Sequence, residues 1–169
     1  MGLTDKAEKR RSDQEVVIRS FQPGDVGYVA YLHGKLYDEV YGFGSTFEYY
    51  VMKGLTEFMG DPAGGDLWIA EVNGEIAGSI AITSQDQKMA QLRWFIMDEN
   101  YQGLGIGKKL MDKAVAFCKD TGYQGVFLWT VNKLEAARYL YQKYGFYLVE
   151  EKTNETWTDA PLVEERWDL

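Results

Sequence analysis

Three glycines lie within five residues, in the segment Gly103-Leu104-Gly105-Ile106-Gly107, and two lysines follow them. The residues after this segment have apolar positions at helical spacing, so the glycines stand at the start of a predicted helix. Glycine lets the backbone approach a phosphate closely, and the first N–H groups of a helix attract anions. The pattern therefore predicts a cradle for a pyrophosphate group.

Two common nucleotide motifs do not fit this segment. A Walker A loop requires Ser or Thr after its Gly-Lys pair, and Lys109 occupies that position. A dinucleotide fingerprint requires a glycine where Lys108 stands, and its turn follows a strand directly, whereas residues 98–102 intervene here. A hinge or a close helix-packing turn remains the alternative to a phosphate site.

Few other side chains in the sequence point to chemistry. With one histidine, His33, and one cysteine, Cys118, the chain cannot build a Cys/His zinc site or an internal disulfide, and we expect no metal. Cys118 shares an apolar helical stripe with Leu110 and Ala114, which favours a core role over a nucleophilic one. His33 titrates near neutral pH, but a single histidine in a helical pattern is typical of a structural role.

The elements that must position the glycine segment alternate between strand and helix patterns. Strand patterns occupy residues 16–21, 67–72, 76–82, 89–97, 126–131, 146–150 and 164–168. Helical spacing occupies residues 25–41, 45–59, 106–122 and 134–144. Asn73-Gly74, between the second and third strands, is a strong hairpin signal. This order predicts a mixed sheet covered by helices, in the α+β or mixed α/β class.

Composition limits the classes of function. The chain has 169 residues, 46% hydrophobic and 26% charged, which suits one globular domain. Residues 1–14 are polar and predict a flexible arm, with a single domain over 15–169. The net charge of −8 argues against a nucleic-acid partner. No apolar run is long enough for a membrane span, and we expect no membrane partner and a cytoplasmic location.

Two segments carry motifs of a known family. Residues 92–98 followed by Gln102–Gly107 resemble the acetyl-CoA motif of the GCN5-related N-acetyltransferases (GNAT). Residues 137–146 resemble the second signature of that family, Ala-x-x-x-Tyr-x-x-x-Gly-Phe. Within the family, the chain is most similar to acetyltransferase modules that follow MarR-type DNA-binding domains. Here only the polar arm precedes the module, so we expect a stand-alone unit without their regulatory role.

The resemblance implies a fold and an activity. The fold would be a mixed, mostly antiparallel sheet of six to seven strands flanked by about four helices. The activity would be direct transfer of an acetyl group from acetyl-CoA to a primary amine of a small molecule, with a homodimer as a possible assembly. A non-catalytic acyl-CoA sensor and an acetyltransferase for protein amines are the alternatives.

The resemblance also assigns cofactor-binding residues. Those implied to hold the pyrophosphate are Gln102, Gly103, Leu104, Gly105, Ile106, Gly107 and Lys108. Phe95 and Met97 would meet the pantetheine arm and thioester through their main chain. Asn132 is a candidate pantetheine contact, although the family's usual asparagine position holds Leu134 here.

Tyr141 matches the family's frequent general acid, because a phenol stays protonated at neutral pH and can protonate a leaving thiolate. Its neighbours Tyr139 and Tyr144 are competing candidates. The general base is not identified by any pattern. The acidic candidates, each as readily a surface carboxylate, are Asp38, Glu39, Glu48 and Glu71.

Arg93 is a charged residue in an otherwise apolar strand pattern. It could bind a substrate carboxylate, or it could pair internally with Glu71 or another acid. Aromatic residues gather where this family builds its acceptor pocket, and they fit either core packing or a pocket for a small amine: Tyr37, Tyr41, Phe43, Phe47, Tyr49 and Tyr50.

Overall fold

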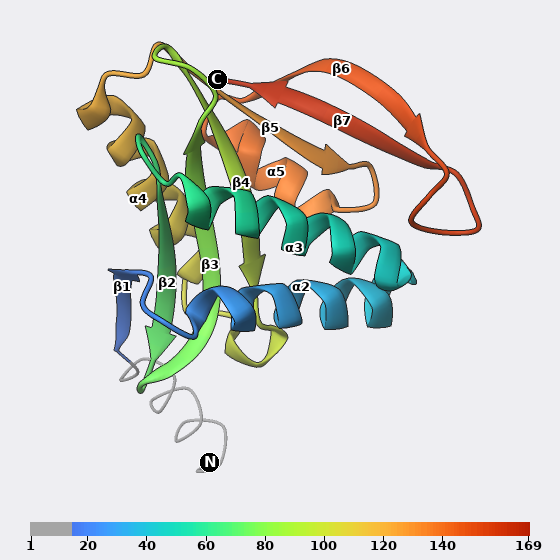
Figure 1. Ribbon diagram of the computed structural model, residues 1–169, viewed down its shortest axis with the longest axis horizontal. Coiled ribbons are helices and arrows are strands. Elements are labelled where there is room, and N and C mark those ends of the chain that lie inside the picture. Colours follow the sequence, from blue (N-terminus) through green and yellow to red (C-terminus); the bar gives the residue numbers. More distant parts are fainter. Residues whose placement is uncertain (1–14) are drawn as a thin grey trace, which may run out of the picture.

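Strands and helices alternate along residues 15–169, the part of the chain that the computed structural model describes (Figure 1). The strands are β1 (Val16–Ser20), β2 (Asp66–Val72), β3 (Glu75–Ser84), β4 (Met89–Met97), β5 (Gly125–Val131), β6 (Tyr147–Asn154) and β7 (Leu162–Asp168). The helices are α2 (Asp25–Tyr41), α3 (Gly44–Gly60), α4 (Ile106–Thr121) and α5 (Glu135–Lys143), with a 3₁₀ turn η1 (Glu99–Tyr101). The predicted polar arm, residues 1–14, lies outside the described residues.

The seven strands form one sheet in the order β1-β2-β3-β4-β5-β7-β6. Neighbouring strands are antiparallel except β4 and β5, which run parallel. The predicted fold class, a mostly antiparallel mixed sheet with four flanking helices, is confirmed for the described residues. The β2–β3 hairpin turns at Asn73 and Gly74, whose φ angles of 52° and 80° suit the two-residue turn that Asn-Gly favours.

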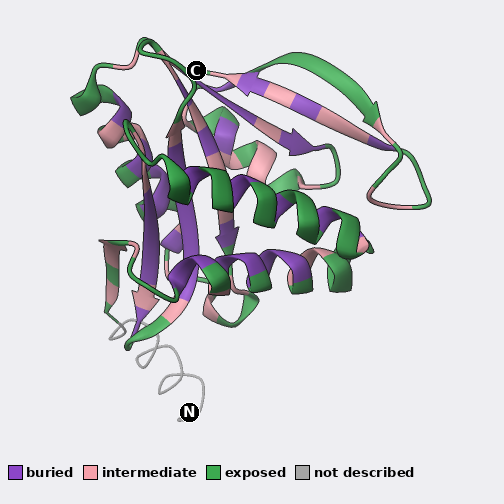
Figure 2. Cartoon of the chain, in the orientation of Figure 1, coloured by how far each residue is buried: buried purple, intermediate pink, exposed green. Residues whose placement is uncertain are grey.

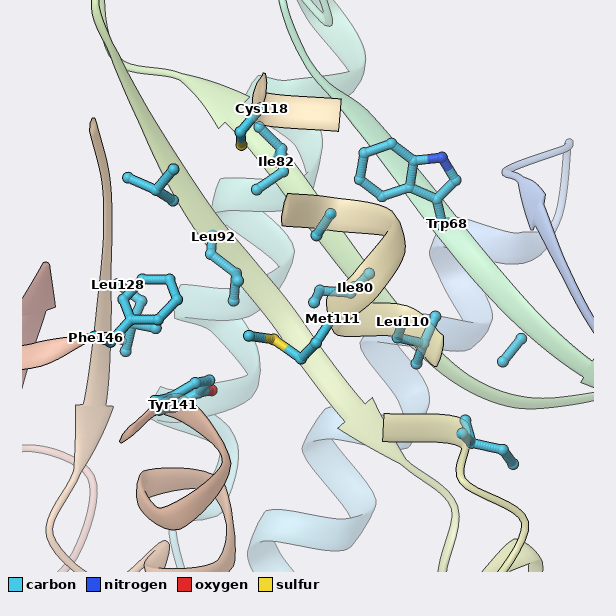
Figure 3. Packing of buried hydrophobic residues seen from close by; sticks show 14 of the residues in the cluster. Trp68, Ile80, Ile82, Leu92, Leu110, Met111, Cys118, Leu128, Tyr141 and Phe146 are labelled. Atoms are coloured by element: carbon cyan, nitrogen blue, oxygen red, sulfur yellow. The ribbon is translucent and has the colours of Figure 1, made fainter. Parts of the chain in front are cut away.

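Two apolar layers hold the helices to opposite faces of the sheet. Helices α2 and α3 bury Val29, Val51 and Leu55 against β2 and β3, and their buried sides face the sheet in Figure 2. On the other face, α4 places Leu110 and Met111 against Ile80 (Figure 3). The predicted core cysteine, Cys118, is buried in this second layer, which raises the pKa of its thiol to about 11.

The edge of the sheet formed by β6 differs from its centre. β6 is exposed along nearly its whole length in Figure 2, and it reaches Asn154, beyond the 146–150 strand pattern. Pairing with β7 extends it, because the polar residues Glu150 to Asn154 have no apolar alternation that would predict a strand. The β6–β7 hairpin thereby carries its loop, residues 155–161, toward α3.

Candidate active site

A cavity of about 300 Å³ opens between helices α2 and α3 and the strands β4 and β5. The cavity lies where β4 and β5 have separated. These two strands pair only over a short stretch, in which Met89, Ala90 and Gln91 of β4 lie opposite Gly125, Val126 and Phe127 of β5. Beyond that point β5 follows β7, and β4 follows β3. The second half of β4 is therefore a strand edge without a partner on its β5 side.

A β-bulge distorts β4 at this opening. Ser79 pairs with Ile96 and Ala81 pairs with Arg93, so β4 has one residue more than β3 over this stretch. Trp94 takes a φ of 47°, which is strained for a bulky residue, and its carbonyl accepts a 2.7 Å hydrogen bond from the buried Ser79 hydroxyl. The bulge turns Arg93 and Trp94 toward α3, whereas Phe95 packs in the core layer on the other face of the sheet, which contains α4.

Of the three candidate tyrosines on or beside α5, only Tyr141 lines the cavity. Its side chain is buried, and its hydroxyl makes no hydrogen bond with another described residue. Burial is the main cause that raises the pKa of Tyr141 well above the usual value of a phenol, and the nearby Tyr37 raises it further. The centroid of the Tyr141 ring lies 6.1 Å from that of Phe95. It lies 5.9 Å from the ring centroid of Phe146, which is near it in Figure 3. Tyr141 therefore presents a protonated hydroxyl to the cavity.

Tyr139 and Tyr144 do not line the cavity. Tyr139 is exposed, and the Lys143 ammonium lies over its ring. The single hydroxyl proton of Tyr144 is shared between two acceptors, the Asp112 carboxylate at 2.5 Å and the carbonyl of Lys108 at 3.1 Å. Tyr144 thus fastens the end of α5 to the first turns of α4.

The predicted pyrophosphate cradle forms the start of α4. Gly103 and Gly105 have φ angles of 80° and 69°, and a Cβ at either position would meet no atom within 4 Å. The first bond of the helix runs from the Lys109 N–H to the Gly105 carbonyl, which leaves earlier N–H groups free to bind an anion. Open space above two left-handed glycines at a helix start fits a pyrophosphate group.

The remaining cradle residues divide between core and surface. Ile106 is buried and Leu104 packs against the same core layer, while Gln102 is exposed. Lys108 pairs with Asp112 on the surface, at 3.2 Å. Gly107 lies against the Met97 sulfur, and a Cβ there would come within 3.0 Å of it. The cradle adjoins the cavity through Met97 rather than lining it.

Phe95 and Met97 both line the cavity along the free edge of β4. Asn132 does not: it is exposed at the end of β5, where its N–H donates to the Val163 carbonyl at 3.0 Å. Its side-chain oxygen accepts a 3.4 Å bond from the Val163 N–H. The pantetheine role of Asn132 stays a prediction.

Arg93 lines the cavity and forms no ion pair with another described residue. The alternative of an ion pair with Glu71 is wrong: Arg93 is level with Leu67 of β2 through Ala81, four residues from Glu71, and Glu71 accepts a 2.8 Å bond from Arg19 instead. The guanidinium lies 4.4 Å from the Trp94 ring, and a Cβ on Gly54 of α3 would clash with it. Burial lowers the pKa of Arg93, although nearby Tyr50 and Glu57 favour its charged form.

An aromatic cluster forms the wall of the cavity on the α2–α3 side. Tyr37, Phe43 and Phe47 pack on one another, with centroid distances between 4.9 and 5.7 Å. Trp157, from the β6–β7 loop, closes the cluster at 5.1 Å from Phe47 and 5.3 Å from Tyr50. The sequence reasoning missed Trp157, since no local pattern shows that a loop late in the chain reaches α3.

His33 also lines the cavity but is held as a structural residue. Its Nδ1 lies 2.8 Å from the carbonyl of Val29 on the same helix. Burial lowers its pKa to about 4, while the bond to Val29 acts in the opposite direction. His33 is therefore neutral near pH 7. The carboxylates that line the cavity are Glu99, Glu135 and Glu164, none of which is among the four acids considered from the sequence.

Known structures share this arrangement of strands and helices. A GNAT-family acetyltransferase from Staphylococcus aureus Mu50 superposes with a TM-score of 0.73, covering 91% of this chain and 98% of that one at 23% identity. The Salmonella typhimurium protein yncA, solved with its cofactor acetyl-CoA, has a TM-score of 0.73 over 91% and 92% of the two chains at 13% identity. These likenesses define the acetyltransferase fold.

Sequence comparison then gives the family. Residues 34–146 match the Acetyltransferase (GNAT) family, which is more than half of the chain, so this chain belongs to that family. N-acetylaspartate synthetase of Danio rerio is 32% identical over 105 residues, which are 60% of this chain and 37% of that protein. The chain spans about a third to a half of the length of the first curated relatives it matches.

Two further features can be stated for residues 15–169. No helix in this part is long and apolar enough to cross a membrane. No group of three or more His, Cys, Asp or Glu side chains there is arranged to hold a metal ion.

Proposed function

We propose that this chain transfers an acetyl group from acetyl-CoA to the primary amine of a small molecule. One observation carries the proposal: the separation of β4 from β5 brings a free strand edge, the Tyr141 hydroxyl and an open cavity together beside a glycine-rich helix start. Family membership supports it, as does yncA, a protein of the same fold that was solved with acetyl-CoA.

Acetyl-CoA supplies the activated acetyl thioester, and residues of this chain hold it. The N–H groups at the start of α4, from Gly103 to Lys108, bind the pyrophosphate. The main chain of Phe95 and Met97 binds the pantetheine arm as an added strand would, because the β5 side of β4 is free. Asn132 is a further candidate for this arm.

The chemical step then needs an amine, a path for one proton and exclusion of water. The amine nitrogen bonds to the acetyl carbon as the carbon–sulfur bond breaks. Tyr141 donates its hydroxyl proton to the departing sulfur and regains one from the nitrogen, so the products are an acetamide and a free thiol. The size of the cavity suits a small molecule better than a polypeptide.

The test combines binding and turnover. Calorimetry with acetyl-CoA should show binding, and a panel of small primary amines should give thiol release together with an acetylated product detected by mass. Binding without thiol release from any amine or peptide would identify an acyl-CoA sensor instead. Products formed only on lysine peptides or peptide N-termini would identify a protein acetyltransferase.

A further inference from the structure

Arg93 is the only lysine or arginine among the residues that line the cavity. Its guanidinium is partly buried between β4 and Gly54 of α3, and it forms no ion pair among residues 15–169, although Glu57 is near enough to favour its charged form. A desolvated cation without a partner is costly, and the planar guanidinium matches a carboxylate through two parallel hydrogen bonds. The cavity thus offers one site for a negatively charged group.

The rest of the nearby wall is aromatic. Tyr50 lies close enough to Arg93 to favour its charged form, and Trp157 packs on Tyr50 at 5.3 Å. The Trp157 ring also packs on Phe43, tilted at a centroid distance of 5.8 Å, and on Phe47, edge-on at 5.1 Å. Such a wall favours a flat apolar group, which gains edge-to-face and stacking contacts.

The acidic residues of the cavity disfavour a second negative charge on the acceptor. Glu99, Glu135 and Glu164 line it against the single cation Arg93. Glu164 lies 3.9 Å from the Lys152 ammonium, which is too distant for a strong pair. A dicarboxylate would leave one carboxylate facing aromatic rings or glutamates, at an electrostatic cost.

We propose that the acceptor is an amino acid with a free carboxylate and an aromatic or large apolar side chain. Arg93 binds the carboxylate, and the pocket closed by Trp157 holds the side chain, which leaves the amine free to face Tyr141. This inference rests on the proposed acetyltransferase function and names its substrate class. It also separates this chain from its relative in Danio rerio, whose name states aspartate as the acetylated amino acid.

Four acceptors separate the contributions of the two groups: phenylalanine, phenethylamine (no carboxylate), alanine (no ring) and aspartate (a second carboxylate). For the native protein we expect kcat/KM for phenylalanine to exceed that for each of the others by about tenfold or more, because an unfilled charged site rejects a substrate strongly. Arg93→Met should lower kcat/KM for phenylalanine to the value for phenethylamine. It should change kcat/KM for phenethylamine by less than about twofold. Arg93→Lys should restore part of the difference.

Trp157→Ala should lower kcat/KM for phenylalanine about fivefold or more. It should change kcat/KM for alanine by less than about twofold. Tyr49→Ala is the matched control, since Tyr49 is exposed on α3 beside Tyr50 and does not line the cavity. A purely structural role for Trp157 would lower Tm and reduce turnover of all acceptors by the same factor.

Two results overturn the substrate class while leaving the acetyltransferase function intact: phenethylamine turned over as fast as phenylalanine, or aspartate preferred. Failure to bind acetyl-CoA or to acetylate any amine overturns the proposed function itself. If acetyl-CoA binds but no acceptor reacts, calorimetry with the CoA-bound protein compares the affinities of phenylalanine and phenethylamine, and a higher affinity for phenylalanine supports the inference. Equal affinities, or none, contradict the inference.

Discussion

Tyr141 and Tyr144 lie three residues apart, yet they face different surroundings. Tyr141 points into the cavity with a hydroxyl that makes no hydrogen bond within the described residues, while Tyr144 bonds to Lys108 and Asp112 of α4. Burial keeps the Tyr141 phenol protonated at every physiological pH, because its pKa lies above the usual value. A proton donor is what a departing thiolate requires.

We predict that Tyr141→Phe lowers kcat about 100-fold, the scale of general acid catalysis, with KM for acetyl-CoA changed less than about twofold. The fold should not be destabilised, since the lost hydroxyl has no hydrogen-bond partner among residues 15–169. Steady-state thiol release measures both constants. Tyr139→Phe, on the exposed side of α5, is the control. Unchanged turnover in Tyr141→Phe would remove this residue from the mechanism.

His33 makes the stability of the protein depend on pH. Its pKa is lowered to about 4 by burial, so the unfolded chain binds a proton between pH 6.5 and 4 that the folded chain does not. Its contribution to stability is therefore fully present above about pH 6.5 and is lost as the pH falls to about 4. The loss amounts to at most about 3 kcal/mol.

His33→Asn tests this dependence, because asparagine retains a donor for the Val29 carbonyl and does not titrate. Urea unfolding of both proteins from pH 7 to pH 4 should show the native protein losing free energy of unfolding faster than the variant. Parallel curves over this range would show that His33 titrates alike in the folded and unfolded chains.

Among the elements, α4 contributes most to the proposed cofactor site, and a glycine lies at each of its ends. Gly105 caps its start and Gly122 its end, with φ angles of 69° and 87°. A Cβ at either position would meet no atom within 4 Å. The two glycines thus have the same backbone strain on substitution, and only Gly105 faces the proposed pyrophosphate.

Gly105→Ala should weaken acetyl-CoA affinity about tenfold or more, since the added methyl group occupies the space proposed for phosphate. Both Gly105→Ala and Gly122→Ala should lower the free energy of unfolding by about 1 kcal/mol, the cost of a left-handed residue with a side chain. Calorimetry with acetyl-CoA and urea unfolding measure the two effects. Equal acetyl-CoA affinities in the two variants would place the pyrophosphate elsewhere.

Strands β4 and β5 illustrate where prediction from sequence stops. Alternating and β-rich residues predicted both strands, at 89–97 and 126–131, close to their actual bounds. Their separation after Gln91 and Phe127 follows from pairing with other strands, β3 and β7. No local pattern encodes that choice of partner, because strand pairing depends on residues far apart in the sequence.

At the scale of the whole molecule, the cavity draws on helices, strands and a loop that span residues 33–164. Trp157 reaches α3 because the β6–β7 hairpin, at the edge of the sheet, projects its loop toward that helix (Figure 1). Whether Arg93 pairs with Glu71 was equally a tertiary question, since the strand register places Arg93 level with Leu67 of β2 rather than with Glu71.

The sequence by itself determined most of the elements, the glycine-rich start of α4 and the three candidate tyrosines on or beside α5. These features are local, because left-handed turns, helix starts and side-chain periodicity depend on neighbouring residues. Only the tertiary structure decided which tyrosine faces the cavity, that Arg93 forms no ion pair within residues 15–169, and that Trp157 closes the aromatic wall of the cavity. These depend on packing between distant segments, where burial and competition for partners set the outcome.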